Sequence, residues 1–327
     1  MSNKRVTSQD VADLAGVSRT TVSFVLNNVE GVQISEATRQ RVIAAADELG
    51  YVPDAAAQAL ASRRSQIIGL VLTRSPHHIA SDAYITQLLD ELIEVVRPHR
   101  IRMMIDIVQP QHQKEAYLEL VRAKRIDGIL LSGPRIDDEA LQTLAEEDFP
   151  TVLMGQLPGT QFCCVDIDNR AAATTAVAHL VSLGHTRIAC ITNAQLTYTA
   201  AVDRLAGYRD AIDEAGIPFD PGLVQHGDFD MQSGYDRMID LLDRPKGMTA
   251  VFVASDTVAL GAKAAIRHKG LTVPGDIALV GFDDLPFARY TDPPLTSIRL
   301  PFAELARKAG EMMINIINNI QPDCRQI

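Results

Sequence analysis

The chain of 327 residues carries 31 Lys and Arg against 41 Asp and Glu, which gives a formal net charge of −10 at pH 7. Its length allows two or three domains, and its 46% hydrophobic and 22% charged residues are ordinary for a globular protein, which excludes a disordered or fibrous chain. The acidic balance excludes a general attraction to nucleic acid, so any DNA-binding surface must be a local cluster of basic side chains.

The charge is divided unevenly along the chain. Residues 1–64 hold seven basic and seven acidic side chains, and the remainder holds 24 basic and 34 acidic ones. The N-terminal MSNKRVTSQD has no apolar segment behind its basic residues, and no run approaches the ~18 apolar residues of a membrane span. We therefore expect a cytoplasmic protein that does not contact a membrane.

Four cysteines stand at positions 163, 164, 190 and 324, mostly in apolar runs and without C-x-x-C spacing. This pattern predicts buried, reduced thiols rather than disulfide bridges or metal ligands. We predict no metal site and no cofactor.

Residues 8–27 satisfy the packing demands of a helix-turn-helix. Two apolar helix faces are separated by Gly16, where the sharp turn needs a positive φ, and Ser18 is placed to cap the second helix. The residues expected to face inwards are Val11, Ala12, Ala15, Val17, Val22, Val25 and Leu26. Those left facing outwards, towards bases and phosphates, are Arg19, Thr20, Ser23, Phe24 and Asn27. An ordinary corner between two helices is the alternative, because A-x-x-x-G-V spacing alone occurs often by chance.

A third helix is predicted between Ser35, a plausible N-cap, and Gly50, a plausible stop, with a helical repeat of apolar residues between them. Three short helices suit a DNA-binding headpiece over residues 1–50. Residues 51–66 are rich in alanine and are too short to form a core of their own.

From residue 67 the pattern changes to alternating strands and helices. Short apolar runs such as IIGLVLT, DGILLS, TRIACIT, TAVFVAS and IALVGF alternate with amphipathic stretches such as YITQLLDELIEVV and DTVALGAKAAIRHKG. Alternation of this kind predicts parallel sheets covered by helices on both faces. Because there are two such series, we predict an α/β fold of two lobes with a cleft between them.

Polar side chains stand where several of these strands end. Arg204 follows a strand and opens a helix, Asp256 follows TAVFVAS, and Asp283 follows IALVGF. Ligands bind at the carboxyl ends of parallel strands, so we place an effector site there. Asp256 is alternatively the N-cap of the next helix, and Asp284 the ion-pair partner of a nearby basic residue.

Other polar residues are less informative. His77 and His78 follow the first strand and could edge the cleft, but we interpret them as solvated loop residues. An enzyme is disfavoured because the chain lacks G-x-S-x-G, G-x-x-x-x-G-K-[ST], G-x-G-x-x-G after a strand, and H-E-x-x-H. A solute-binding protein would carry a secretory signal in place of the helix-turn-helix.

Several motifs in combination resemble the lactose/galactose repressor (LacI/GalR) family, over nearly the whole chain. They are TSQDVADLAGVSRTTVSFVLNN, SEATRQRVIAAADELGYVPDAAAQALAS, DRLAGY, ASDTVALGA and GFDDLPFARYTDPPLTSIRLP. The resemblance implies a helix-turn-helix headpiece on a two-lobed body like that of periplasmic binding proteins. It also implies a sequence-specific transcriptional regulator, in most cases a repressor, that binds near-palindromic operator DNA as a homodimer.

The resemblance assigns DNA contacts to particular positions. Arg19, Thr20 and Phe24 match the positions that contact bases, and residues 54–62 match a hinge helix whose leucine, here Leu60, wedges into the minor groove. Without the family, Leu60 would be interpreted as packing on its own lobe. Phe24 departs from the expected polar residue and either contacts a thymine methyl or closes the headpiece core. The complete predicted DNA-binding set is Thr7, Ser18, Arg19, Thr20, Ser23, Phe24, Asn27 and Leu60.

The resemblance also assigns the effector site. Relatives use the arginine that matches Arg204 to hold the effector and place aromatic rings at the positions of Tyr84 and Phe229. The complete predicted effector-binding set is Asp82, Tyr84, Ser132, Arg204, Phe229, Asp256 and Asp283. One arginine among carboxylates and aromatic faces favours a neutral sugar or glycoside, since an anionic effector would need a second arginine.

The predicted organisation is a headpiece (1–50), a hinge and linker (51–66), an N-terminal lobe (67–165 with 299–319) and a C-terminal lobe (166–298 with 320–327). Relatives continue past the QPDCRQI end with one more short strand, and no heptad tail is present, which favours a dimer over a tetramer. Helix 83–97 is expected in the dimer contact. The alternative function is a catabolite-control regulator, which responds to a phosphorylated carrier protein rather than to a sugar.

Overall fold

The computed structural model describes residues 6–27, 31–52, 59, 64–75, 78, 82–109, 113–244 and 247–320. The chain divides into two compact units, residues 1–66 and residues 67–327, and each is described separately. Among the described residues, no helix combines the length and the apolar character that crossing a bilayer requires.

The first unit is a bundle of three short helices: α1 (Ser8–Ala15), α2 (Arg19–Leu26) and α3 (Glu36–Glu48). Gly16 ends α1 with φ 64°, in the left-handed region, as the predicted sharp turn requires. Ser18 and Ser35 are the N-caps of α2 and α3, and each side chain accepts a hydrogen bond from the backbone three residues on. The predicted caps and turn are therefore confirmed.

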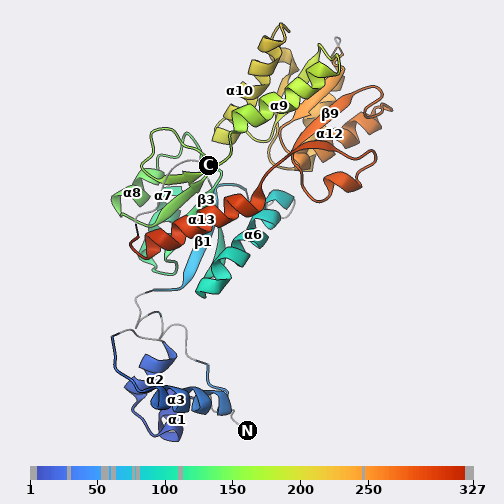
Figure 1. The fold of residues 1–327 in the computed structure, drawn as a ribbon. Helices are drawn as coiled ribbons and strands as arrows, with labels where there is room; N and C mark the ends of the chain where they lie inside the picture. The colour runs from blue at the N-terminus through green and yellow to red at the C-terminus, as the bar shows by residue number, and fades with distance from the viewer. Residues whose placement is uncertain are drawn as a thin grey trace. The chain divides into compact units, whose positions relative to one another are not determined.

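Figure 1 shows the three headpiece helices close together, and the core between them follows the predicted apolar pattern. Its buried side chains are Val11, Ala12, Ala15, Val22, Val25, Val42, Ala45 and Ala46. Val17 and Leu26, which were expected to face inwards, are partly buried against it. Of the predicted hinge 54–62, only Ala59 is described, so Leu60 lies outside the described residues.

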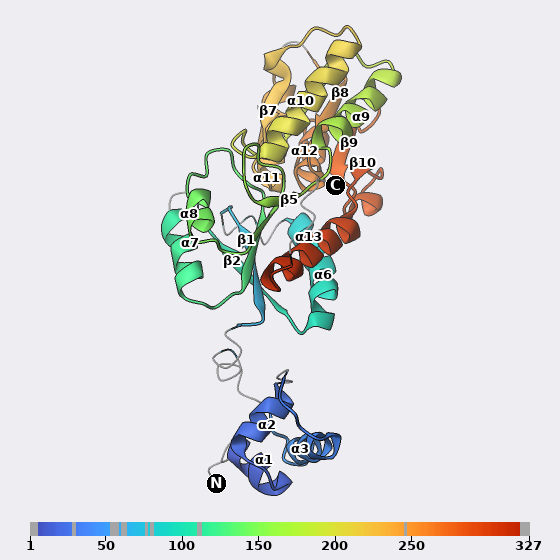
Figure 2. The ribbon, with the colours of Figure 1, turned by 60° about the vertical axis from the view of Figure 1, so that its left-hand side comes forward.

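The second unit contains two five-stranded parallel sheets. The first has the order β2-β1-β3-β4-β5. Its strands are β1 (Ile67–Leu72), β2 (Arg102–Ile107), β3 (Gly128–Ser132), β4 (Thr151–Met154) and β5 (Cys163–Val165). Figure 2 shows helices α6 (Ala83–Val96) and α13 (Phe302–Ile317) on one face, and α7 (Gln113–Arg122) and α8 (Leu141–Glu146) on the other. The C-terminal helix α13 therefore completes the N-terminal lobe.

The second sheet has the order β10-β9-β8-β6-β7. Its strands are β6 (Ile188–Thr192), β7 (Val224–His226), β8 (Ala250–Val253), β9 (Ala278–Asp283) and β10 (Thr296–Arg299). It is covered by the helix pairs α9 (Asn169–Ser182) with α10 (Thr199–Glu214), and α11 (Met231–Leu242) with α12 (Asp256–His268). Short 3-10 helices occur at Arg97–His99, Pro221–Leu223 and Ala288–Tyr290.

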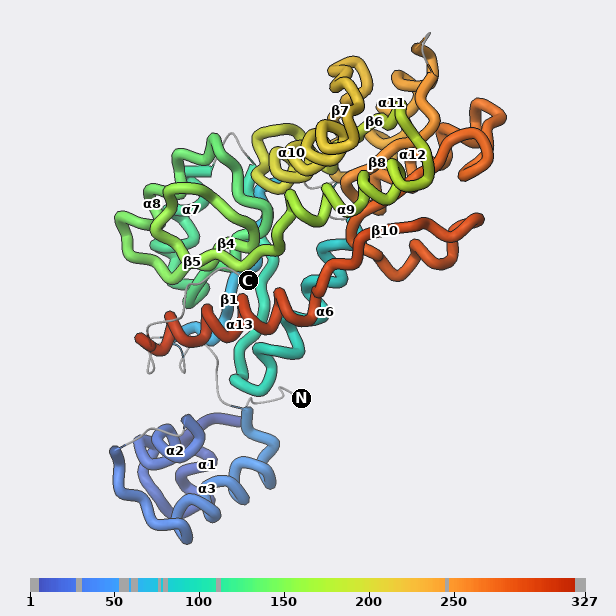
Figure 3. The backbone as a smooth tube through the Cα atoms, turned by 45° about the horizontal axis from the view of Figure 1, so that its top comes forward, coloured from blue at the N-terminus to red at the C-terminus, as the bar shows by residue number. Residues whose placement is uncertain are grey.

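The two sheets share one topology, which confirms the predicted two-lobed α/β fold. In each, the first strand lies between the second and the third, so the chain reverses its direction of winding beside β1 and beside β6. Figure 3 follows the backbone between the lobes from β5 to α9 and from β10 to α13. Binding sites in such sheets lie at the carboxyl ends of the strands beside this reversal.

Two sequence predictions fail in the body. Cys164 and Cys190 are buried free thiols, but Cys163 is disulfide-bonded, so the expectation of reduced thiols is wrong for Cys163. The apolar pattern of a strand predicts that its cysteines are buried. It does not predict which distant residue comes close enough to form a disulfide. Helix α10 begins at Thr199, so Arg204 lies inside the helix and does not open it.

Candidate functional site

The predicted recognition surface of the headpiece is the part of α2 that its own core leaves uncovered. Arg19 and Thr20 are exposed, and Ser23, Phe24 and Asn27 are half-buried. The Asn27 amide donates to the Ser23 hydroxyl at 3.1 Å. Phe24 is absent from the partly buried apolar side chains that pack against the described headpiece core, which favours its outward role over closing the core.

Two of the predicted DNA-binding residues also hold helix ends. The Thr7 hydroxyl accepts from the Asp10 amide at 3.3 Å, and the Asp10 carboxylate accepts from the Thr7 amide at 2.8 Å, which forms a capping box at the start of α1. The Ser18 hydroxyl accepts from the Thr21 amide at 3.1 Å. Each side chain therefore orients a helix N-terminus, where free backbone amides favour a phosphate.

A pocket lies between the two lobes of the body, at the carboxyl ends of the strands. Six of the seven predicted effector residues line it: Asp82, Tyr84, Ser132, Arg204, Phe229 and Asp283. The lining also includes residues that the sequence reasoning missed, among them Arg74, Asp166, Asn193, Tyr198 and Thr199. Arg74, Ser132 and Asn193 follow or end β1, β3 and β6, the strands beside the two topological reversals.

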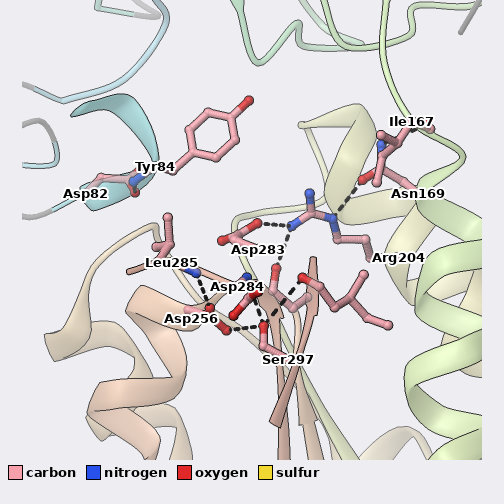
Figure 4. Close-up of polar contacts among 12 residues, drawn as sticks. Asp82, Tyr84, Ile167, Asn169, Arg204, Asp256, Asp283, Asp284, Leu285 and Ser297 are labelled. Atoms are coloured by element: carbon pink, nitrogen blue, oxygen red, sulfur yellow. Dashed lines mark hydrogen bonds and ion pairs between the residues drawn. The ribbon is translucent and has the colours of Figure 1, made fainter. Parts of the chain in front are cut away.

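Arg204 is held by its own lobe. Its Nε donates to the Asn169 side chain at 2.8 Å, its Nη1 donates to the Ala254 carbonyl at 2.7 Å, and Nη1 lies 3.7 Å from the Asp283 carboxylate (Figure 4). The guanidinium lies 3.9 Å from the centroid of the Phe282 ring. These contacts fix the guanidinium in one orientation at the pocket wall.

The pocket carboxylates are strongly influenced by burial. Burial raises the pKa of Asp283 well above its ordinary value, and the Arg204 charge opposes this shift. Burial likewise raises the pKa of Asp166. Hydrogen bonds that its carboxylate accepts from the backbone and from Asn169 partly offset this rise. Asp283 and Asp284 have φ values of 117° and 54°, a strained conformation that often marks binding sites.

Asp256, the seventh predicted effector residue, does not line the pocket. It is the first residue of α12, after the N-cap Ser255, and it is fully buried. Its carboxylate accepts from the Ser297 hydroxyl at 2.6 Å and from the Leu285 amide at 2.8 Å (Figure 4), and burial raises its pKa to about 6. Asp256 therefore positions the loop that follows Asp283, the last residue of β9.

Asp284 pairs with Arg299 at 2.7 Å, which confirms the ion-pair alternative for this carboxylate.

The interpretation of His78 as a solvated residue is wrong, because it is only 3% exposed. Its Nε2 lies 3.4 Å from the Asp228 carboxylate, and its ring lies 5.7 Å from that of Phe229. His77 lies outside the described residues.

Arg74 is the most important omission from the sequence reasoning. It is 5% exposed, forms an ion pair with Asp82 and stacks 4.0 Å from the centroid of the Phe229 ring. Asp82 also caps α6 by accepting from the Tyr84 amide at 3.0 Å. The side chain of Arg74 stands two residues after β1, so the rule that identified Asp283 by its strand end would have found it. The expectation of a single arginine is therefore wrong.

The two predicted aromatic residues of the pocket, Phe229 and Tyr84, have different neighbours. Phe229 packs edge-on against Tyr198 with centroids 4.9 Å apart, and the Arg74 guanidinium stacks on its face. The ring is therefore in contact with other side chains of the protein. The Tyr84 ring lies 5.4 Å from that of Phe302, and burial raises the pKa of its hydroxyl to about 12. Tyr84 also interacts electrostatically with both pocket arginines.

Two family models match the chain. The model described as bacterial regulatory proteins, lacI family, matches residues 7–54. The model described as a periplasmic binding protein-like domain matches residues 177–327. The first contains all three headpiece helices, and the second covers most of the C-terminal lobe.

Curated relatives match over almost their full length. The transcriptional regulator CelR of Thermobifida fusca is 35% identical over 317 residues, which cover 96% of this chain and 92% of the relative. The transcriptional regulator GalR of Escherichia coli strain K12 is 35% identical over 317 residues, which cover 96% of this chain and 90% of the relative.

Solved structures agree with this assignment. The Lac repressor dimer bound to operator and the anti-inducer ONPF is 31% identical with a TM-score of 0.82, over 98% of this chain and 97% of that one. The CelR-cellobiose complex is 33% identical with a TM-score of 0.74, over 99% and 96%. These are regulators that bind DNA, which agrees with the prediction that the chain is not an enzyme. Together with the helix-turn-helix and the two-lobed body, they place this chain in the LacI family of bacterial transcriptional regulators.

Proposed function

We propose that this LacI-family regulator is a repressor whose affinity for a near-palindromic operator is controlled by a neutral sugar or glycoside bound between its two lobes. It acts in the cytoplasm as a homodimer, with α6 in the dimer contact. The observation that carries the proposal is a pocket whose charges are balanced within the protein while its lining stays polar.

The charge balance argues for a neutral ligand even though the pocket holds two arginines. Arg74 is paired with Asp82 and Arg204 with Asp283, while Asp166 adds a further carboxylate to the lining. An anion would therefore meet no surplus of positive charge. Hydroxyl groups suit this lining, because each both donates to carboxylates and accepts from guanidinium groups. Among the relatives, one is recorded as a complex with cellobiose.

The DNA-binding part of the proposal rests on α2 and on the predicted hinge. Arg19 and Thr20 are exposed at the start of α2, the end of a recognition helix that enters the major groove. Residues 54–62 form the hinge in this proposal, and Leu60 wedges into the operator centre. Two headpieces of a two-fold dimer require two half-sites, which explains a near-palindromic operator.

Control follows from a difference in effector affinity between two arrangements of the lobes. The effector shifts the lobes towards the arrangement it binds better, and the change in DNA affinity cannot exceed that difference. Arg204, Asp283 and Asp166 hold the effector, and Asp256 keeps the loop after Asp283 in place.

The test combines selection of genomic fragments bound by the purified full-length protein with binding titrations against neutral sugars. We expect one near-palindromic sequence to be enriched, and its release to respond to one sugar or to closely related ones. Arg204→Ala should abolish the response and spare operator binding. Failure of every sugar, together with a response to a phosphorylated carrier protein, would establish the catabolite-control alternative instead.

A further inference from the structure

Two loops from different lobes are joined through their backbones, and we call this pair of segments the clasp. Residues 134–136 follow β3 of the N-terminal lobe, and residues 197–199 follow β6 of the C-terminal lobe. Their middle residues, Arg135 and Tyr198, form an antiparallel bridge. The loops exchange two backbone hydrogen bonds, of which the shorter, at 2.9 Å, is donated by the Ile136 amide. Because both partners of each bond belong to the chain, the clasp needs no ligand to form.

The side chain of Tyr198 extends the clasp into the N-terminal lobe. It is 6% exposed, and its hydroxyl donates to the carbonyl of Thr73, the residue after β1. The Thr73 hydroxyl donates in turn to the Gly133 carbonyl at 3.0 Å, which ties together the loops after β1 and β3. The Arg135 guanidinium lies 5.0 Å from the centroid of the Tyr198 ring and is bound by Asp137 at 2.9 and 2.7 Å. Tyr198 is therefore the central residue of the clasp.

The clasp lies away from the two places where the chain crosses between the lobes. These crossovers leave β5 and β10, which are edge strands of their sheets (Figure 3). The clasp loops follow β3 and β6, which lie two and three strand positions from those edges. Since neighbouring strands are about 4.8 Å apart, the strand ends that carry the clasp are roughly 10 to 14 Å from those that carry the crossovers. A rotation of one lobe about the crossovers would therefore pull the clasp apart.

The clasp also forms one wall of the pocket between the lobes. Pro134, Tyr198 and Thr199 line the pocket on this side, and Asp166, the residue after β5, lines it near the first crossover. The pocket thus extends from a crossover to the clasp. A molecule that enters or leaves on the side opposite the crossovers must pass the clasp.

We propose that the clasp holds the two lobes closed by the protein's own contacts, before any effector binds, and that it must open to admit a molecule to the pocket. An arrangement that is stabilised without a ligand is already populated when the ligand arrives. The pocket is then reached only through the fraction of molecules in which the clasp is open, so the clasp limits the rate of entry. This inference does not depend on which effector the pocket takes.

The chain offers a matched pair of variants for the test. Tyr198→Phe removes the hydroxyl that bonds to Thr73 and keeps the ring. Tyr208→Phe is the control, because the similarly buried Tyr208 hydroxyl donates to the Ile188 carbonyl at 2.8 Å within the C-terminal lobe. Each variant loses one buried hydrogen bond to a backbone carbonyl, so urea denaturation should show similar losses of stability. Only Tyr198→Phe breaks a bond between the lobes.

The first measurement is hydrogen exchange in the full-length protein without added sugar. It is read at the Ile136 amide, because the Ile136 side chain is 59% exposed and the clasp rather than burial would protect this amide. We expect protection of about tenfold or more over an unstructured chain. Tyr198→Phe should reduce it about fivefold, as the loss of one hydrogen bond predicts, and Tyr208→Phe less than about twofold.

The second measurement tests access to the pocket. Ser132→Cys places a thiol at a position that lines the pocket and is 1% exposed, so its alkylation by iodoacetamide requires opening. The rate is read from the peptide that carries residue 132. Adding Tyr198→Phe should raise this rate about fivefold, and adding Tyr208→Phe should raise it less than about twofold.

Three results would contradict the proposal. Exchange of the wild-type Ile136 amide at the rate of an unstructured chain would show that the clasp does not hold the lobes closed. Equal changes in the two tyrosine variants would show a general loss of stability rather than the opening of a clasp. If protection falls in Tyr198→Phe and alkylation is not faster, the clasp does not control entry. Neither measurement uses a sugar, so these outcomes are separate from the test of the proposed function.

Discussion

Arg204 and Arg74 line one pocket and are buried to nearly the same extent, 7% and 5% exposed. Each stacks on a phenylalanine, at 3.9 and 4.0 Å, and each pairs with an aspartate. Their partners differ in origin. Every partner of Arg204 comes from the C-terminal lobe, whereas Arg74 joins Asp82 of its own lobe to Phe229 of the other.

This difference in partners suggests that the two arginines have different roles. The protein itself satisfies Arg204 Nε and Nη1, so Arg204 is a fixed anchor within one lobe. The contact of Arg74 with Phe229 joins the two lobes, and its Nε lacks a partner among the described residues. We therefore expect Arg74, rather than Arg204, to respond to lobe movement.

Arg204→Ala tests the anchor and should have the largest effect on stability. It leaves the buried Asp283 carboxylate without its cation, and breaking such a pair costs roughly 3 to 5 kcal/mol. Urea denaturation of the purified variant measures this loss, with Arg170→Ala as the control because Arg170 forms a more exposed ion pair with Asp210. A loss below about 1 kcal/mol would show that Arg204 is not a structural anchor.

Asp256→Asn tests the support beneath Asp283 through its pH dependence. The pKa of Asp256 rises from its ordinary value of 3.8 to about 6 on burial, so the folded state binds this proton more tightly than the unfolded state. The stabilisation from that proton is complete below pH 4 and is lost as pH rises through 6. Between pH 4 and pH 7, the free energy of unfolding of the variant should therefore increase by about 2 kcal/mol relative to that of the wild type. A constant difference across this range would contradict the assignment.

Phe229→Leu tests the interlobe contact of Arg74 and should have the smallest effect on stability. It removes the ring stacked 4.0 Å from the Arg74 guanidinium and keeps an apolar side chain at this buried position. Loss of a buried cation–π contact predicts a destabilisation of about 1 to 2 kcal/mol, measurable by urea denaturation. Phe282→Leu provides the comparison at Arg204, since its ring stacks at 3.9 Å within one lobe. If only Phe229→Leu changes the radius of gyration in solution scattering, the contact with Arg74 controls the lobe arrangement.

Features that depend on neighbouring residues were predictable from the sequence. The turn at Gly16, the caps at Ser18 and Ser35, and the apolar faces of α1 to α3 follow from helix periodicity and local hydrogen bonding. The strands were predictable as apolar runs, and Ser132 and Asp283 line the pocket because polar residues that end parallel strands collect at one edge. The positions of Tyr84 and Phe229 in the pocket came instead from the family resemblance.

Asp256 shows the limit of that reasoning. It stands at a strand end like Asp283, yet its carboxylate accepts from Ser297 and from the Leu285 amide, away from the pocket lining. A strand end specifies the edge of the sheet where a side chain lies. It does not specify whether that side chain points into the cleft or into the protein.

The sequence by itself determined the family, the two-lobed fold and the local structure of the recognition helix, because each depends on motifs or on residues a few positions apart. Only the tertiary structure decided that Arg74 meets Phe229, that His78 is buried, and that Tyr198 reaches a backbone carbonyl 125 residues away. The physical reason is that these contacts join strand-end loops of two lobes, and their formation depends on how the lobes pack, which no local periodicity records.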